Sequence, residues 1–319
     1  MRRSFWINRI IYSPNHQKSK NQKSVNVTRT AEIYKDIQQI ICRTLEEADG
    51  KGKFSESTWE KEIGSGITCV MQNGAIIEKA GVNFSSVKGK FNDNMARLLG
   101  EEAGTFAATG ISSIIHSGNP FVPTIHMNVR YFSLDNGSVW FGGGIDLTPA
   151  YINLEEARRF HQTIKNICDK YDITFYPSWK NWADDYFYLP HRKETRGIGG
   201  IFFDRVKPAS DIDFEKMLLL TSELARIYPI IYGELMDANG RKPFTSAQKK
   251  WQKIRRGRYV EFNLIHDRGT KFGLESEGNI ESILVSLPAE VEWVYQYQPK
   301  PGSPEGLTQE LLKKGIDWV

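Results

Sequence analysis

Hydrophobic and polar residues alternate along residues 124–132, and this alternation predicts a strand with two different faces. One face carries His126, Asn128, Arg130 and Phe132. The opposite face is apolar and consists of Ile125, Met127, Val129 and Tyr131. The apolar face suits a core. The other face carries an imidazole, an amide and a guanidinium in a row. Such a row is better suited to binding an anionic ligand than to packing in a core.

Further strands are predicted wherever apolar runs are bounded by turn residues. Residues 67–72 and 75–82 flank Asn73-Gly74, which is a strong two-residue hairpin signal. Residues 139–147 and 198–204 are also predicted strands, and the three glycines at 142–144 indicate a bulge or a ligand lying against bare backbone. Alternation predicts two more strands, at 259–267 and 280–287.

Apolar residues at helical spacing predict the helices. The ordered part of the chain is predicted to begin near Ala31 with a helix that ends at Gly50. Asn153 can cap a helix over residues 154–171, and Asp213 can cap another over 214–228. Residues 248–256 predict a short basic helix.

The fold class predicted from this order is α+β. Strands outnumber helices, several are joined as hairpins, and β-α-β alternation is missing, so we expect a single domain with a large, mainly antiparallel sheet covered by helices. That domain spans residues 31–319. Residues 1–30 are basic and contain no acidic residue, which predicts a disordered extension, with a transit peptide as the alternative.

Composition excludes several classes of protein. Hydrophobic residues make up 40% and aromatic residues 12%, which is enough for a sizeable core. Lys and Arg total 42 against 38 Asp and Glu, so the small surplus gives no reason to expect a nucleic-acid partner. The three cysteines lack CxxC spacing, which fits a reducing compartment, and no apolar run is long enough to predict a membrane span.

Histidines and arginines supply the candidate chemistry. The histidines are either metal ligands or hydrogen-bonding and acid–base groups, and the lack of HxH or HExxH spacing favours the second role for His116, His126, His161 and His191. Three arginines are candidate anchors for carboxylates: Arg130, Arg196 and Arg268. Asp267 is a candidate acceptor for N–H donors, and no Rossmann, P-loop or activated-nucleophile motif is present.

Several long motifs, in order, resemble the oxygen-dependent coproporphyrinogen III oxidase family. They are the 114–130 segment, WFGGGIDLTP (140–149), HRKETRGIGGIFFD (191–204), VEFNLIHDRGTKFGL (260–274) and ESILVSLP (281–288). The resemblance runs from about Ala31 to Val319.

The resemblance implies an enzyme of heme biosynthesis. Its reaction is the oxidative decarboxylation of two propionates of coproporphyrinogen III to vinyl groups, giving protoporphyrinogen IX with release of CO2 and H2O2. It implies a flat sheet sandwiched between helices, a homodimer, and no cofactor besides O2, with a divalent metal cation as the alternative. We expect a cytoplasmic location, or a mitochondrial one if the basic N-terminus is a transit peptide.

The resemblance also implies roles for individual residues. His126 corresponds to the proton donor, and Asp267 and Arg268 to an active-site pair. The implied substrate contacts are Ser112, Asn128, Val129, Arg130, Gly278 and Asn279. The implied metal ligands are His116, His126, His161 and His191. Asn279 stands where the family has arginine, which leaves that propionate contact open.

Two other functions are compatible with these residues. One is a metal-dependent oxygenase that uses the four histidines. The other is a tetrapyrrole-binding protein without turnover.

Overall fold

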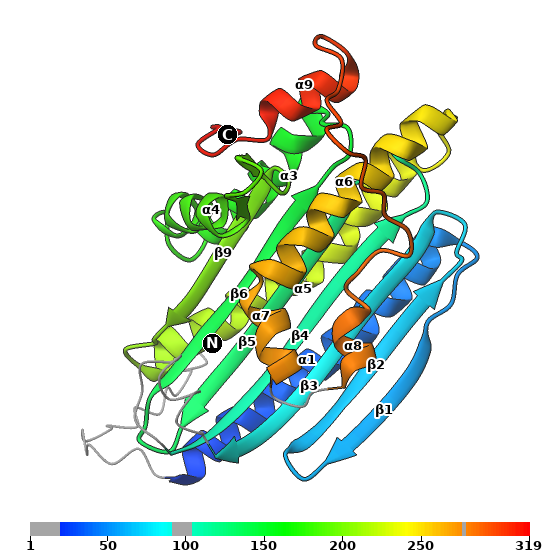
Figure 1. Cartoon of the computed structure of the whole chain (residues 1–319). Coiled ribbons are helices and arrows are strands. Elements are labelled where there is room, and N and C mark those ends of the chain that lie inside the picture. The colour runs from blue at the N-terminus through cyan, green and yellow to red at the C-terminus, as the bar shows by residue number, and fades with distance from the viewer. Residues whose placement is uncertain (1–19, 91–103, 276–278) are drawn as a thin grey trace, which may run out of the picture.

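A seven-stranded antiparallel sheet forms the centre of the molecule (Figure 1). The computed structural model describes residues 20–90, 104–275 and 279–319. The spatial order of the strands is β1 (Ser55–Lys61), β2 (Gly64–Gln72), β3 (Ile77–Lys90), β4 (Thr105–Ser117), β5 (Thr124–Leu134), β6 (Val139–Thr148) and β9 (Gly199–Val206). Neighbouring strands are antiparallel throughout, and a separate two-stranded ribbon pairs β7 (Tyr188–Leu189) with β8 (Glu194–Thr195).

Helices cover both faces of the sheet, as Figure 1 shows. On one face lie α1 (Lys20–Asp49) and α5 (Asp211–Asn239), which contact each other and the central strands. Across the opposite face run α6 (Ser246–Ile265), α7 (Arg268–Glu275) and α8 (Ile280–Leu284). The residues that the structure describes also form three further helices, α3 (Leu154–Asp169), α4 (Phe175–Tyr186) and α9 (Pro304–Leu311). The predicted α+β class and antiparallel sheet are therefore confirmed.

The predicted two-faced strand is β5. Its side chains alternate between buried and partly exposed along its length. Ile125, Met127, Val129 and Tyr131 are at most 1% exposed and pack in the core between the sheet and α5. Tyr131 packs edge-on against Phe214 of α5, with ring centroids 5.5 Å apart. The polar residues of β5 consequently face α6 to α8.

Helix α4 protects the β9 edge of the sheet. Trp179 stacks on Phe203, which faces the core, whereas Tyr186 at the end of α4 stacks on Phe202, which faces the opposite side. The free edge β1 is mostly exposed. It carries charged residues, which discourage pairing with another strand.

Several predicted elements are confirmed, some with different bounds. Asn153 caps α3 as predicted. Asn73-Gly74 lies in the connection between β2 and β3 as predicted, but this connection spans residues 73–76 because β3 begins at Ile77, so it is not the predicted two-residue turn. Strand β6 contains the predicted bulge, where its register with β9 shifts between positions 141 and 143. Helix α1 begins at Lys20 rather than near Ala31, and residues 1–19 lie outside the described part of the chain.

The predictions at three other segments are wrong. Helix α5 starts at a Ser210 cap rather than at Asp213 and continues through Pro229. Residues 259–265 belong to the long helix α6 rather than to a strand. A Thr245–Gln248 capping box starts this helix, and Tyr259 and Phe262, three residues apart, share a face of a helix but would lie on opposite faces of a strand. Residues 280–284 form α8, capped by Asn279, rather than a strand.

Asp49 joins the end of α1 to the β2–β3 hairpin. Its carboxylate accepts backbone N–H bonds from Gly52, Ala75, Ile76 and Ile77 at 2.7–2.8 Å. Burial opposes the charge, but these four donors outweigh burial and lower the pKa of Asp49. The side chain therefore satisfies backbone groups at two places in the chain.

We predict that Asp49→Ala lowers the free energy of unfolding by roughly 3 kcal/mol or more, because it leaves buried donors unsatisfied. Urea denaturation measures this loss. Asp36→Ala is the matched control, since Asp36 lies exposed on the same helix. Equal losses in the two variants would contradict the role of Asp49.

Candidate active site

A cleft of about 340 Å³ lies between the sheet and the segment from α6 to α8. The face of the sheet beneath the cleft carries three rows of cross-strand partners. The first contains Ile114, His126 and Asp146; the second contains Asn83, Ser112, Asn128 and Gly144; the third contains Gly110, Arg130 and Gly142. Because alternate residues of each strand face the same side, these rows form one surface.

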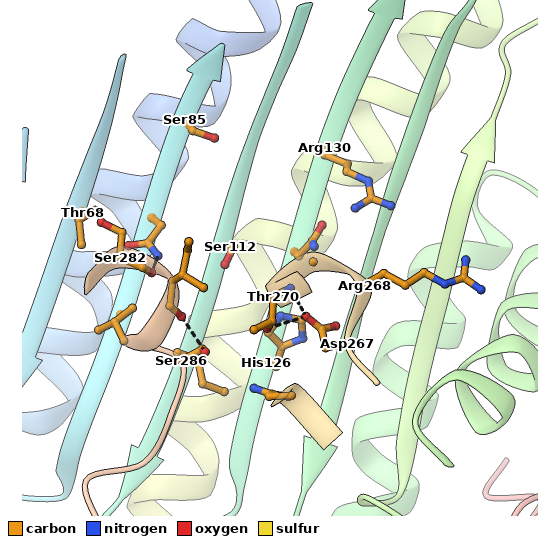
Figure 2. Close-up of a pocket in the computed structure, with 18 of the residues that line it drawn as sticks. Thr68, Ser85, Ser112, His126, Arg130, Asp267, Arg268, Thr270, Ser282 and Ser286 are labelled. Carbon is orange, nitrogen blue, oxygen red and sulfur yellow. Dashed lines mark hydrogen bonds between the residues drawn. The ribbon is translucent and has the colours of Figure 1, made fainter. Parts of the chain in front are cut away.

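The cleft has a charged half and a hydroxyl-rich half, and Figure 2 shows the two halves side by side. Over β5 and towards β9 lie the charged residues Arg130, Asp267 and Arg268, with His126 below Asp267. Over β2 to β4 lie Thr68, Ser85, Ser112, Ser282 and Ser286. An anionic group therefore meets guanidinium groups in one half and neutral hydrogen-bonding groups in the other.

His126 is held by a buried chain of ionisable groups. Its Nδ1 donates to Asp146 Oδ1 at 2.8 Å, and Arg196 donates to the other oxygen of Asp146. Burial opposes the charge of Asp146, but the guanidinium of Arg196 and the bond from His126 hold the pKa of Asp146 below its usual range. Since an ionised carboxylate only accepts, Nδ1 of His126 carries the proton and Nε2 is left for the cleft.

Arg196 is enclosed by aromatic rings and is not available as a carboxylate anchor. Its side chain is 3% exposed. The guanidinium carbon lies 4.3–4.7 Å from the ring centroids of Phe187, Tyr259 and Phe262. The prediction that Arg196 anchors a carboxylate of a ligand is therefore wrong, because its charge is already used by Asp146.

Asp146 is a site residue that the sequence analysis did not identify, and Asp204 and Tyr186 are two more. Asp146 lies in the WFGGGIDLTP motif, but no role was assigned to it. The feature that identifies Asp146 is its strand pairing, because it is the cross-strand partner of His126. That register could not be read before β5 and β6 were placed beside each other.

Arg130 faces the cleft as predicted and forms an ion pair there. Its Nη2 lies 2.8 Å from Asp204 Oδ1, and the two side chains are 37% and 21% exposed. Gly142 makes the pair possible, because a Cβ at this position would lie 2.7 Å from Asp204 Oδ1 and 2.8 Å from Arg130 Nε. Asp204 therefore occupies the place that a ligand carboxylate would take on Arg130.

Asp267 lines the cleft and is also the residue before α7. Its Oδ2 accepts from the backbone N–H and hydroxyl of Thr270 at 2.6 and 2.8 Å, and its Oδ1 accepts from Tyr186 at 2.9 Å. These bonds fix the carboxylate but leave acceptor capacity on both oxygens. Burial and the neighbouring Asp267 raise the pKa of Tyr186, which therefore remains a donor at neutral pH.

The remaining predicted contacts separate into three groups. Ser112 and Asn128 lie on the floor of the cleft, and Arg268 lines it with its guanidinium 5.9 Å from the ring centroid of Tyr186. The side chain of Val129 lies in the core on the opposite face of β5 and cannot reach a ligand in the cleft. Asn279 lines the cleft while capping α8, and Gly278 lies outside the described residues.

The four histidines proposed as metal ligands do not converge. His116 and His161 are both fully buried, and each donates from Nε2 to a backbone carbonyl while accepting a hydroxyl bond at Nδ1. His126 bonds to Asp146, and His191 bonds to Glu261. In the part of the chain that the structure describes, no three His, Cys, Asp or Glu residues are grouped to hold a metal ion. The predicted four-histidine set therefore does not fit a metal.

The burial of His116 and His161 makes stability depend on pH. Burial is the main cause that lowers the pKa of each to about 3 from an ordinary 6.5. Between these values the unfolded chain binds more protons than the folded one. Their contribution is therefore fully present above pH 6.5 and is lost as the pH falls towards 3.

We predict that the free energy of unfolding falls by roughly 1 kcal/mol for each of these histidines between about pH 7.5 and about pH 5.5. Urea denaturation at both pH values measures the change. His161→Gln lowers stability but removes one histidine's share of the pH dependence. An unchanged pH dependence in that variant would show that His161 is not held neutral.

Comparison with known proteins identifies relatives over most of the chain. A family profile described as Coproporphyrinogen III oxidase matches residues 29–318. The chain is 44% identical to the oxygen-dependent coproporphyrinogen-III oxidase, chloroplastic, of Glycine max, covering 93% of this chain and 81% of the relative. It is 45% identical to the mitochondrial protein of that name from Homo sapiens, covering 89% of this chain and 65% of the relative. It is 46% identical to the Drosophila melanogaster protein, covering 89% and 76%.

Proposed function

The chain belongs to the coproporphyrinogen III oxidase family, and on this premise we propose that the cleft carries out the oxygen-dependent reaction for which its relatives are named. The chain is accordingly an oxidoreductase of heme and porphyrin biosynthesis. Each step converts one propionate of coproporphyrinogen III to a vinyl group. The side chain loses CO2 and two hydrogens, and O2 takes up the two hydrogens as H2O2. Two such steps give protoporphyrinogen IX.

The observation that carries the proposal is the position of His126 opposite Asp267 in a cleft that also offers Arg130. A porphyrinogen has pyrrole N–H donors at its centre and carboxylates at its rim. The Asp267 carboxylate can accept hydrogen bonds from the pyrrole N–H groups at the centre of the macrocycle. The Arg130 guanidinium can donate two parallel hydrogen bonds to a carboxylate at its rim. His126 supplies a proton-carrying group between them.

We assign proton transfer to Nε2 of His126. Asp146 keeps Nδ1 protonated, so Nε2 can give or take a proton at the substrate without a change of tautomer. The Asp267 carboxylate orients the pyrrole N–H groups. Removal of a pyrrole proton leaves an electron-rich ring that reacts with O2, so in this proposal the substrate supplies the electrons and the protein supplies position and charge.

The missing arginine at Asn279 has a structural consequence for substrate binding. Asn279 caps α8 by accepting from Glu281 N at 3.1 Å and Ser282 N at 3.4 Å. Its neighbours in this half of the cleft are hydroxyl and amide groups rather than cations. We propose that the substrate carboxylate here is bound by neutral donors, among them Ser112.

Turnover by metal-free protein tests the proposed function directly. The chelator-treated chain is mixed with coproporphyrinogen III in air, and the product is read by porphyrin fluorescence after oxidation. We expect vinyl-bearing product from wild type and none without O2. Activity that appears only after a metal is added would support the metal-dependent oxygenase, and binding without product would support the carrier.

Homodimer formation and location are also proposals. We propose that the chain is a homodimer, and a monomeric mass by light scattering would contradict this. The names of two relatives, chloroplastic and mitochondrial, place those proteins in organelles, which supports the mitochondrial alternative over the cytoplasmic expectation. A fluorescent fusion to residues 1–30 that stays in the cytosol would favour the cytoplasmic expectation. No helix in the described ranges has the length and apolar character needed to cross a membrane.

We predict that Asp146→Asn lowers kcat by roughly 100-fold or more, because the amide can donate to Nδ1 and favour the wrong tautomer of His126. Steady-state kinetics measures the loss, and thermal unfolding separates it from damage around Arg196. In a His126→Ala background the same change should have little further effect on kcat. A full additional loss there would contradict action through His126.

We predict opposite effects on KM from the two partners of the Arg130–Asp204 pair. Arg130→Lys should raise KM roughly tenfold, because lysine lacks the bidentate fork. Asp204→Asn should lower KM by up to roughly fivefold, because a partly exposed ion pair is weak and its loss frees Arg130. A higher KM in Asp204→Asn would show that Asp204 orients Arg130 rather than competing with the substrate.

A further inference from the structure

Outside the cleft, two histidines face each other at the corner between α6 and α7. Nε2 of His266 lies 3.3 Å from Nδ1 of His191, and the rings lie 26° from parallel with centroids 5.4 Å apart. His191 follows β7, whereas His266 ends α6. The pair therefore joins two segments that are far apart in the sequence.

The His191 ring is held from its other side by a rigid carboxylate. Glu261 accepts from His191 Nε2 at 2.8 Å, and also from Arg192, Arg258 and the indole of Trp293 at 2.7–3.0 Å. Because N–H donors meet both oxygens of this carboxylate, Glu261 acts as an acceptor towards Nε2 of His191. An ionised Glu261 keeps the proton on Nε2, so Nδ1 of His191 presents its lone pair to His266.

This arrangement has the features of a metal site with two protein ligands. A carboxylate that accepts from the far nitrogen of a histidine is the usual outer partner of a metal-bound imidazole. Two nitrogens about 2.05 Å from a tetrahedral ion are separated by about 3.3 Å, which is the spacing seen here. In the metal-free chain the 3.3 Å contact is a hydrogen bond between the two rings. His266 can release its lone pair at Nε2 by moving its proton to Nδ1, so that a metal ion can take the place of the shared proton.

We propose that His191 and His266 form a site for a divalent transition metal that prefers imidazole, with Zn²⁺ as the best geometric match and solvent as the remaining ligands. The charged residues around the two histidines determine which metal ions can bind. Arg192 and Arg258 neutralise Glu261, and Lys271 lies near His266, so simple attraction does not favour a cation. Ions held mainly by nitrogen bonds, such as Zn²⁺ and Cu²⁺, therefore bind, and Mg²⁺ does not.

The site is distinct from the four-histidine set and does not rest on the proposed reaction. Only His191 is common to both, and neither His191 nor His266 lines the cleft. His266 directly precedes Asp267, so an ion bound to the pair would fix the corner that carries the Asp267 carboxylate.

Metal binding by the full chain tests the proposal without an activity assay. Chelator-treated protein is titrated with ZnCl2 by calorimetry and equilibrium dialysis, with MgCl2 in parallel. We expect saturable binding of Zn²⁺ that weakens roughly tenfold or more in His266→Ala and in His191→Ala. Lys271→Ala is the matched control, because it keeps both imidazoles and should bind Zn²⁺ at least as tightly as wild type.

A second readout identifies the ligands. Cu²⁺ at one equivalent should show nitrogen hyperfine splitting from two imidazoles in electron paramagnetic resonance, reduced to one in His266→Ala. Thermal unfolding of each variant shows whether it is folded, and His266→Ala leaves all the bonds to Glu261 in place. Unchanged Zn²⁺ affinity in both histidine variants, or no saturable binding by wild type, would overturn the proposal.

Discussion

Burial of one face of the sheet against α1 and α5 is the interaction on which the rest of the structure depends. Alternate residues of β5 are at most 1% exposed on that side, and fully burying a residue of this size contributes about 1.5–3 kcal/mol. This face fixes the register, because a slip of one residue would turn the apolar set towards the cleft. Once the register is fixed, His126, Asn128 and Arg130 must lie together on the opposite face.

The same register places Asp146 beside His126 and Gly142 beside Arg130. The first pairing gives the histidine a fixed tautomer, and the second leaves room for the ion pair with Asp204. Neither partner is close in the sequence to the residue it serves. The cleft is therefore built from the sheet upward, and α6 to α8 add Asp267 and the hydroxyl groups of α8 from above.

The histidines discussed above have different roles, which depend on the groups that their ring nitrogens contact. His116 and His161 use both nitrogens for hydrogen bonds within the fold and remain neutral. His126 uses one nitrogen for a buried carboxylate and offers the other to the cleft. The partly exposed His191 uses one nitrogen for Glu261 and faces a second histidine with the other. Residue type alone does not separate these roles.

The sequence by itself determined the α+β class, the antiparallel sheet, the two faces of β5 and most of the cleft-facing residues, because period-two patterns and turn residues are local signals. It failed at residues 259–265 and 280–284, where aromatic and β-branched residues fit a strand or a helix equally well and only caps and packing decided for α6 and α8. Only the tertiary structure showed Asp146 beside His126, Arg196 enclosed by aromatic rings, Val129 in the core, and the four histidines apart. These facts depend on cross-strand register and on contacts between distant segments, which no local pattern encodes.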